Sequence, residues 1–180
     1  MVIKRADIPE VSIIKNEEKS FDYIDSFQSF FSDKDQKIGL TDVVRIFASG
    51  GPKWAESLLK LRNILMKPFG LKTGDDMPVV HADEIKYEAG EQIGIFKLLD
   101  KAENEIILGE EDKHLNFKVS MLLEPVADDP DKKKLSITTA VHFNNFFGRL
   151  YFLPVKPFHK MILRSSLKDI IYKLEQHKEQ

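Results

Sequence analysis

The second half of the chain alternates apolar and polar residues at every second position, the pattern of a β-strand with one buried face. Residues 113–124 and 134–145 alternate over long stretches, and residues 93–99 and 105–108 predict a shorter hairpin before them. We expect residues 127–133 to form the loop between the two long strands. The alternation predicts an antiparallel sheet with a core on one face and water on the other.

The first half predicts one more strand and two short helices. Apolar residues fall on alternate positions of residues 21–31, which favours a half-buried strand. Thr41 and Asp42 predict the start of a short helix, because such residues cap helices and suit their first turn. A second helix is expected from Pro52, with an apolar stripe along one side that begins at Trp54.

The C-terminus predicts a long amphipathic helix from Lys156 to His177. Its apolar stripe has the helical spacings four, three and four, and consists of Leu163, Leu167, Ile170 and Leu174. Residues 147–153 are expected to form a helical turn before it, with a bend at the two prolines that follow.

Composition narrows the class of protein. The 180 residues are 42% apolar and 31% charged, which is typical of one globular domain. We predict an arm over residues 1–18 and a single domain over residues 19–178. The absence of Cys excludes disulfides and thiolate chemistry. No secretion signal or membrane span is evident, so a cytoplasmic protein is expected.

The formal net charge of -2 hides a segregation of charge. Basic residues gather in 41–72 and 156–180, and acidic residues gather in 83–112. We interpret these as solvated faces that attract each other within one fold. Nucleic-acid binding is not predicted, because no basic face interleaved with aromatic residues is present and the pI is about 6.2.

The order of the predicted elements is a strand, two short helices, four or more antiparallel strands and a long helix. This order resembles the START-like helix-grip fold of lipid-transfer, polyketide-cyclase and plant pathogenesis-related proteins. The amino-acid sequence of residues 20–175 is similar to that of a bacterial family of uncharacterised START-like proteins. The segments that carry the resemblance are residues 54–62, 104–109, 112–115, 136–139 with Val141, 148–151 and 157–159.

The resemblance implies an α+β helix-grip domain, in which a curved antiparallel sheet wraps the long C-terminal helix around an internal cavity. It implies no settled activity. Domains of that family are sometimes fused to nicotinamide-binding domains, but no G-x-G-x-x-G fingerprint follows a strand here. Four residues within the segments similar to that family are candidates for a polar network at one end of the cavity, or for a folding clamp. They are Glu105, His114, Arg149 and Tyr151.

Polar residues on apolar faces are the other candidates for ligand contacts. His159 lies on the stripe of the last helix, where it either exchanges a proton with a ligand or simply satisfies a backbone group. Arg62 lies on the second helix beside its apolar stripe, and either binds an anionic head group or forms a salt bridge. Asp25 shares the apolar face of the first strand, and we expect a twist or bulge to return it to water, since a buried unpaired carboxylate is costly. The predicted cavity walls are Trp54, Phe117, Phe143 and Phe158.

The sequence therefore predicts binding of a small hydrophobic or amphipathic ligand in an internal cavity. One alternative is a cyclase- or dehydratase-like enzyme that uses Asp25 or His159 in the same cavity. The other is a protein-interaction module with a solid core. No metal is predicted, because the five His lack metal-ligand spacing, and no cofactor is predicted. A Ser hydrolase and a phosphate-binding loop are not predicted either, because G-x-S-x-G and phosphate-loop signatures are absent. The sequence does not give the oligomeric state.

Overall fold

The computed structural model describes residues 2–48, 88, 90–93 and 96–176. The predicted second helix, with Trp54 and Arg62, lies outside the described residues, as does the side chain of Tyr151.

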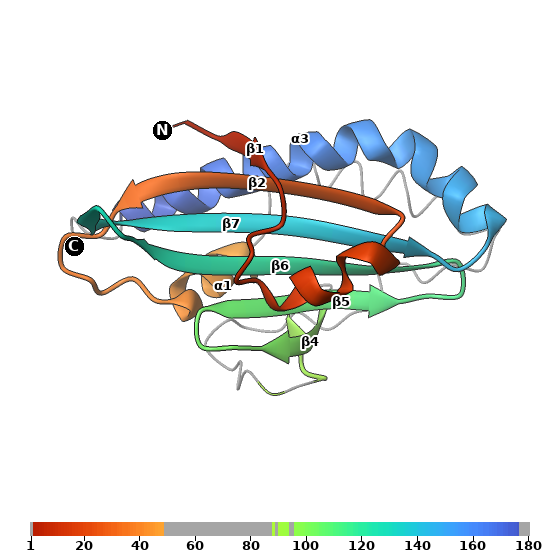
Figure 1. Cartoon of the computed structure of the whole chain (residues 1–180), viewed down its shortest axis with the longest axis horizontal. Helices are drawn as coiled ribbons and strands as arrows, with labels where there is room; N and C mark the ends of the chain where they lie inside the picture. The colour runs from red at the N-terminus through yellow and green to blue at the C-terminus, as the bar shows by residue number, and fades with distance from the viewer. Residues whose placement is uncertain (1, 49–87, 89, 94–95, 177–180) are drawn as a thin grey trace.

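The chain has the predicted α+β class. Seven strands form one antiparallel sheet in the order β1-β2-β7-β6-β5-β4-β3, and the C-terminal helix α3 lies against one of its faces (Figure 1). The strands are β1 (Lys4–Ala6), β2 (Tyr23–Ser32), β3 (Gln92–Ile93), β4 (Phe96–Lys101), β5 (Glu105–Glu111), β6 (Leu115–Val126) and β7 (Asp129–Phe143).

The two long strands form a tighter hairpin than the sequence predicts. We expected residues 127–133 to be a loop, but β7 already begins at Asp129 and Lys133 pairs with Pro125 of β6. The first residues of β7 are charged and mostly exposed on both faces. Apolar alternation therefore does not mark this part of the strand.

The core lies between the sheet and α3 (Phe146–Gln176). Odd-numbered residues of β2, β6 and β7 face the helix, and Phe27, Val119 and Ile137 pack in one cluster with Leu163 and Leu167. The helix is 31 residues long, about 46 Å at 1.5 Å per residue, and includes the region we expected to be a separate turn. Pro154 and Pro157 both lie inside this one helix.

The short helix α1 (Leu40–Ala48) adds Val43, Val44 and Ile46 to the same core. It begins at Leu40, so its N-cap lies two residues before Thr41, the N-cap that the sequence predicts. The carboxylate of Asp42 accepts the Gly39 N–H at 2.9 Å, so Gly39 is the N-cap and Asp42 reaches back to it.

The other face of the sheet does not simply meet water, contrary to our expectation. The N-terminal segment crosses it, and includes the 3-10 helix η1 (Ile13–Ser20) (Figure 1). Ile8 and Ile14 pack there against Ile107 and Ala140. Four further residues of this face with small or short polar side chains are about 1% exposed, namely Ser26, Ser120, Ser136 and Thr138. Among the described residues, no helix is both long and apolar enough to cross a membrane.

Candidate functional site

A buried carboxylate lies on the helix-facing side of β2. Asp25 is 1% exposed, so the strand does not return it to water as we expected. The reason is a countercharge from the edge strand: Nη2 of Arg5 on β1 lies 3.2 Å from Oδ1 of Asp25. A carboxylate that is paired in this way tolerates burial far better than an isolated one.

Tyr23 is the second partner of this carboxylate. Tyr23 lies two residues before Asp25, so both side chains are on the same face of the strand. The Tyr23 hydroxyl donates a hydrogen bond to Oδ2 of Asp25. Burial raises the pKa of Tyr23 well above its usual value, and the hydrogen bond to the Asp25 carboxylate adds to the effect. Tyr23 is therefore a protonated donor at any pH near neutrality.

His159 of α3 lies in the same cluster as Tyr23 and Asp25. Its ring centroid lies 6.2 Å from that of Tyr23, in an edge-on arrangement. Burial lowers the pKa of His159, while the nearby negative charge of Asp25 opposes the shift. The imidazole is therefore neutral near pH 7, and its buried Nδ1 has no hydrogen-bond partner among the described residues.

Thr139 supplies a second polar atom of this kind. It is the direct cross-strand neighbour of Asp25 in the β2–β7 pairing, so their side chains share the helix-facing side of the sheet. Its buried Oγ1 has no hydrogen-bond partner among the described residues. Buried polar atoms are nearly always paired in proteins, so two such atoms in one region indicate a place where a polar group can bind.

Aromatic side chains form one side of this cluster. The ring of Phe152, buried on α3, lies 4.8 Å from that of Tyr23, 5.4 Å from that of Phe143 and 6.2 Å from that of His159. The Nζ of Lys156 lies 5.1 Å from the centre of the Tyr23 ring. We call Arg5, Tyr23, Asp25, Thr139 and His159, with this aromatic side, the β2–α3 polar cluster.

The other predicted wall residues are spread along the fold. Phe143 belongs to the β2–α3 polar cluster, whereas Phe117 packs edge-on against Phe96 of β4, with ring centroids 5.6 Å apart. Phe158 is 45% exposed on α3. Trp54 and Arg62 stay predictions.

The predicted polar network divides into separate contacts. Glu105 is buried on the face away from α3, where it accepts hydrogen bonds from Ser12, Ile13 and Ser120. It therefore fastens the N-terminal segment to the sheet. It sits at one end of β5, whereas His114 lies in the turn that follows the other end.

His114 and Arg149 both lie where α3 begins. Nδ1 of His114 lies 3.2 Å from Oδ1 of Asn145, and Nη2 of Arg149 lies 2.9 Å from Oδ1 of Asp22. These contacts tie the start of the helix to the turn between β5 and β6 and to the residue before β2. The two alternatives for these residues, a polar network at the cavity and a folding clamp, stay predictions.

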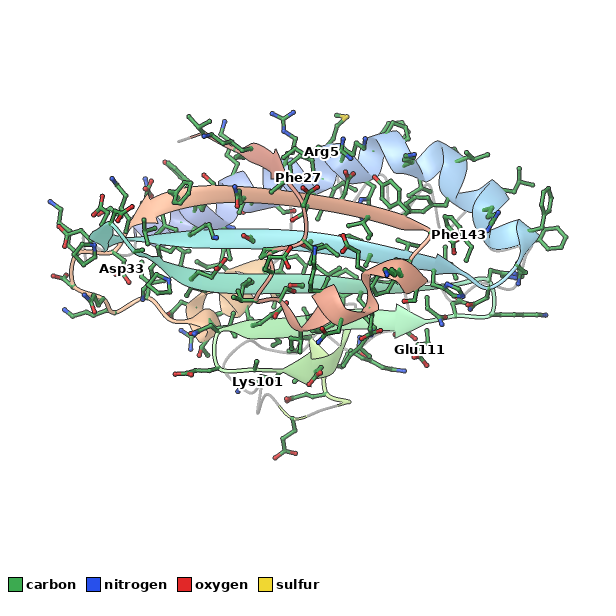
Figure 2. The ribbon with its side chains drawn as sticks, in the orientation of Figure 1. Arg5, Phe27, Asp33, Lys101, Glu111 and Phe143 are labelled. Atoms are coloured by element: carbon green, nitrogen blue, oxygen red, sulfur yellow. The ribbon has the colours of Figure 1, made fainter. Side chains whose placement is uncertain are left out.

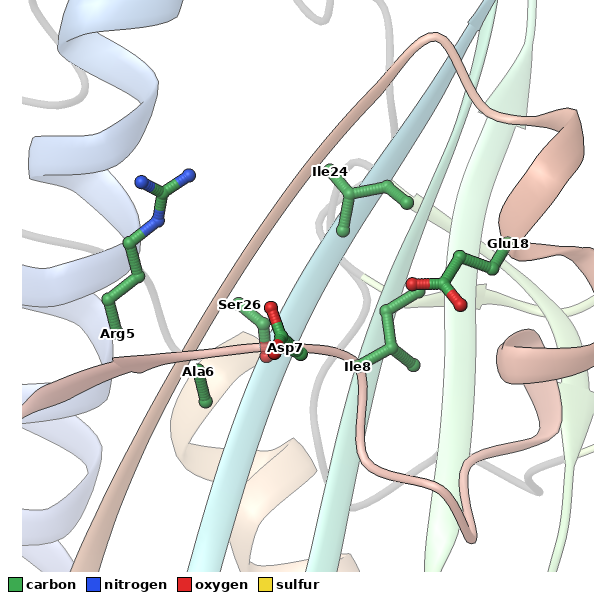
Figure 3. Close-up of a pocket in the computed structure, with 7 residues that line it drawn as sticks. All are labelled: Arg5, Ala6, Asp7, Ile8, Glu18, Ile24 and Ser26. Carbon is green, nitrogen blue, oxygen red and sulfur yellow. The ribbon is translucent and has the colours of Figure 1, made fainter.

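A hollow of about 460 Å³ lies on the opposite face of the sheet, beneath the N-terminal segment (Figure 3). Its lining combines charged, polar and apolar residues, including Asp7, Glu18, Ser26 and Ile24. Figure 3 shows the Arg5 side chain pointing away from Asp7 and Ser26. This hollow is not the cavity that the sequence predicts between the sheet and the helix, which stays a prediction.

Sequence reasoning did not single out Arg5, Tyr23 or Thr139. Thr139 had a visible signal, since it is a hydroxyl in the otherwise apolar series of residues 135, 137 and 141. Arg5 had none, because its pairing with Asp25 depends on how the N-terminal strand docks.

The model of a family described as a protein of unknown function (DUF2867) matches residues 18–166. No curated protein and no solved structure matches the chain.

Proposed function

This chain belongs to the DUF2867 family of proteins of unknown function, and we propose that it binds a small hydrophobic or amphipathic ligand between its sheet and α3. The observation that carries the proposal is the pair of buried, unpartnered polar atoms, Nδ1 of His159 and Oγ1 of Thr139. Thr139 lies on the face of the sheet that packs against α3, and His159 lies on α3. A site of this kind, apolar with a few placed polar groups, is typical of small-molecule binding.

The chemistry of the cluster limits the polar end of the ligand. A neutral imidazole and a threonine hydroxyl can each donate or accept a hydrogen bond. We therefore propose a hydroxyl or carbonyl group at the cluster, with the apolar body of the ligand beside Phe143 and Phe152.

The same arrangement supports a helix-grip fold. One long helix packs on one face of a seven-stranded antiparallel sheet, and α1 closes part of the same side. In such a fold a ligand lies between the helix and the sheet, where the β2–α3 polar cluster is found.

Native mass spectrometry of the purified protein, followed by solvent extraction, tests the ligand. We expect an adduct of defined mass that Thr139→Val and His159→Phe each weaken at least about tenfold, the cost of one lost hydrogen bond in a buried site. Ser136→Ala is the matched control, since Ser136 has a buried, unpartnered hydroxyl on the same strand but on the opposite face. Absence of any adduct, or equal loss in the control, would contradict the proposal, and absence would favour a solid-core interaction module.

A second candidate function is catalysis by the same cluster. Tyr23 is a protonated hydroxyl held by a carboxylate, and His159 is a neutral imidazole beside it, so the two groups can give and take a proton. A cyclase- or dehydratase-like reaction needs such a pair in a dry site. The material extracted from wild-type protein and from Tyr23→Phe distinguishes the two functions: a binding protein yields one compound from both, and an enzyme yields product from one and unreacted substrate from the other.

A further inference from the structure

The first half of α3 presents an apolar face away from the core. Phe146 is 72% exposed and Leu153 is 66% exposed. With 3.6 residues per turn, the apolar residues of this face fall within an arc of about 140°. We call it the outward face of α3, and its members are Phe146, Phe147, Leu150, Leu153, Pro154, Pro157, Phe158 and Met161. Figure 2 shows side chains projecting from α3 on the side away from the strands.

The charges on the same stretch are all of one sign. Between Phe146 and Lys168 the helix contains no Asp or Glu, and its Lys and Arg residues are Arg149, Lys156, Lys160, Arg164 and Lys168. By the same helical geometry, Arg164 and Lys168 continue the outward face beyond Met161, and Lys160 lies at its edge. These three form no ion pair within the described part of the chain.

We propose that the outward face of α3 docks on an anionic lipid bilayer. An apolar helix face rich in aromatic residues and bordered by cations lies in the plane of the membrane, with its apolar side chains at the boundary of head groups and acyl chains. The cations meet the negative lipid surface. The helix lies on the membrane and does not cross it.

Charge favours this occupant over a second copy of the chain. A symmetric dimer through this face would bring two identical sets of cations together, with no carboxylate on either face to balance them. An anionic bilayer removes that repulsion and also accepts the exposed aromatic rings.

The docking surface is separate from the proposed ligand site. Phe152 and His159 lie on the opposite side of α3 from Leu153 and Met161, so changes to the outward face leave the β2–α3 polar cluster intact. Either proposal can fail without the other.

The test is flotation of the full chain with phosphatidylcholine vesicles and with phosphatidylcholine–phosphatidylglycerol vesicles. We expect binding to the anionic vesicles only, weakened by added salt. Lys160→Gln/Arg164→Gln/Lys168→Gln should weaken it about a hundredfold, at about fivefold per cation. Phe146→Ser/Leu153→Ser should weaken it by at least about tenfold.

Two controls match these variants on other surfaces. Lys34→Gln/Lys101→Gln/Lys113→Gln removes the same number of exposed charges, and Val11→Ser removes an apolar side chain that is exposed on the N-terminal segment. Circular dichroism should show that all variants fold. Failure to bind anionic vesicles, or equal losses in controls and α3 variants, overturns the proposal. So does a dimer in light scattering that Phe146→Ser/Leu153→Ser dissociates, which would assign the face to a protein contact.

Discussion

Arg5 and Asp25 form an ion pair in which one partner is largely solvent-exposed and the other fully buried, with Nη2 and Oδ1 3.2 Å apart. Arg5 lies opposite Phe27 in the β1–β2 pairing, so it reaches the carboxylate diagonally across the edge of the sheet. The N-terminal strand is thus part of the electrostatic environment of the candidate site.

Arg5→Met is expected to lower the free energy of unfolding by about 1–2 kcal/mol. Removing one partner of a buried pair costs about 3–5 kcal/mol, and an exposed pair is worth less than about 1 kcal/mol, so this half-exposed pair falls between. Urea unfolding measures the loss, and Lys4→Met on the adjacent, exposed position of β1 is the control. In a double-mutant cycle with Asp25→Asn, strictly additive effects would show that the pair contributes nothing.

Glu105→Gln is expected to loosen the N-terminal segment. Its carboxylate accepts hydrogen bonds from the hydroxyls of Ser12 and Ser120 and from the Ile13 N–H, at 2.5–2.7 Å, and an amide offers only one acceptor oxygen. We expect a loss of about 1–3 kcal/mol, the range for hydrogen bonds to charged groups and for a donor left buried without a partner.

Hydrogen exchange shows where Glu105→Gln acts. Amides in residues 8–20 should exchange faster. Amides of the β6–β7 hairpin should lose no more protection than the fall in the global free energy of unfolding accounts for. Glu103→Gln, an exposed position two residues earlier, should change neither. Unchanged exchange in residues 8–20 would show that other contacts hold the segment.

Gly148→Ala is expected to disrupt the start of α3. A Cβ at position 148 would lie 2.1 Å from the backbone carbonyl oxygen of His114, and a backbone atom cannot move aside as a flexible side chain does. We expect a loss of at least about 2 kcal/mol by thermal or urea unfolding, typical of overpacking. Gly39→Ala, where the nearest atom is 3.9 Å from the new Cβ, should cost less, about 1 kcal/mol, because Ala is a poorer N-cap than Gly.

Local patterns predicted the elements of the sheet–helix core well. The alternation in β6 and β7 and the stripe from Leu163 to Leu174 mark residues that each meet one continuous apolar layer, so their periodicity survives in the fold. The pattern failed where this condition is absent. The start of β7 lies beyond the core and has charged residues on both faces, so no alternation identifies it.

The covered outer face and the β2–α3 polar cluster depend on contacts between distant segments. Ser120, Ser136, Thr138 and Ala140 occupy the polar positions of the alternation, yet they are small, which is a sign that another segment covers them. The burial of Asp25 could not be predicted from β2 alone, since its countercharge comes from another strand. An alternating pattern indicates which residues share a face but not what lies on that face.

His159 should make the stability of the protein depend on pH in a definite direction. Burial lowers its pKa in the folded state, so below the unfolded value of about 6.5 the unfolded chain binds a proton that the folded chain resists. The effect of His159 on stability is therefore absent above about pH 6.5 and becomes increasingly destabilising as the pH falls below that value.

His159→Gln, which stays neutral, should lose less stability between pH 7.5 and pH 5.5 than the wild type does, and urea unfolding at the two pH values measures the difference. His142→Gln is the control, because His142 is half-exposed on β7 and lies outside the β2–α3 polar cluster. Equal pH dependence in wild type and His159→Gln would mean that the ring is protonated as readily in the folded protein as in water, and it could then not serve as the neutral group of the β2–α3 polar cluster.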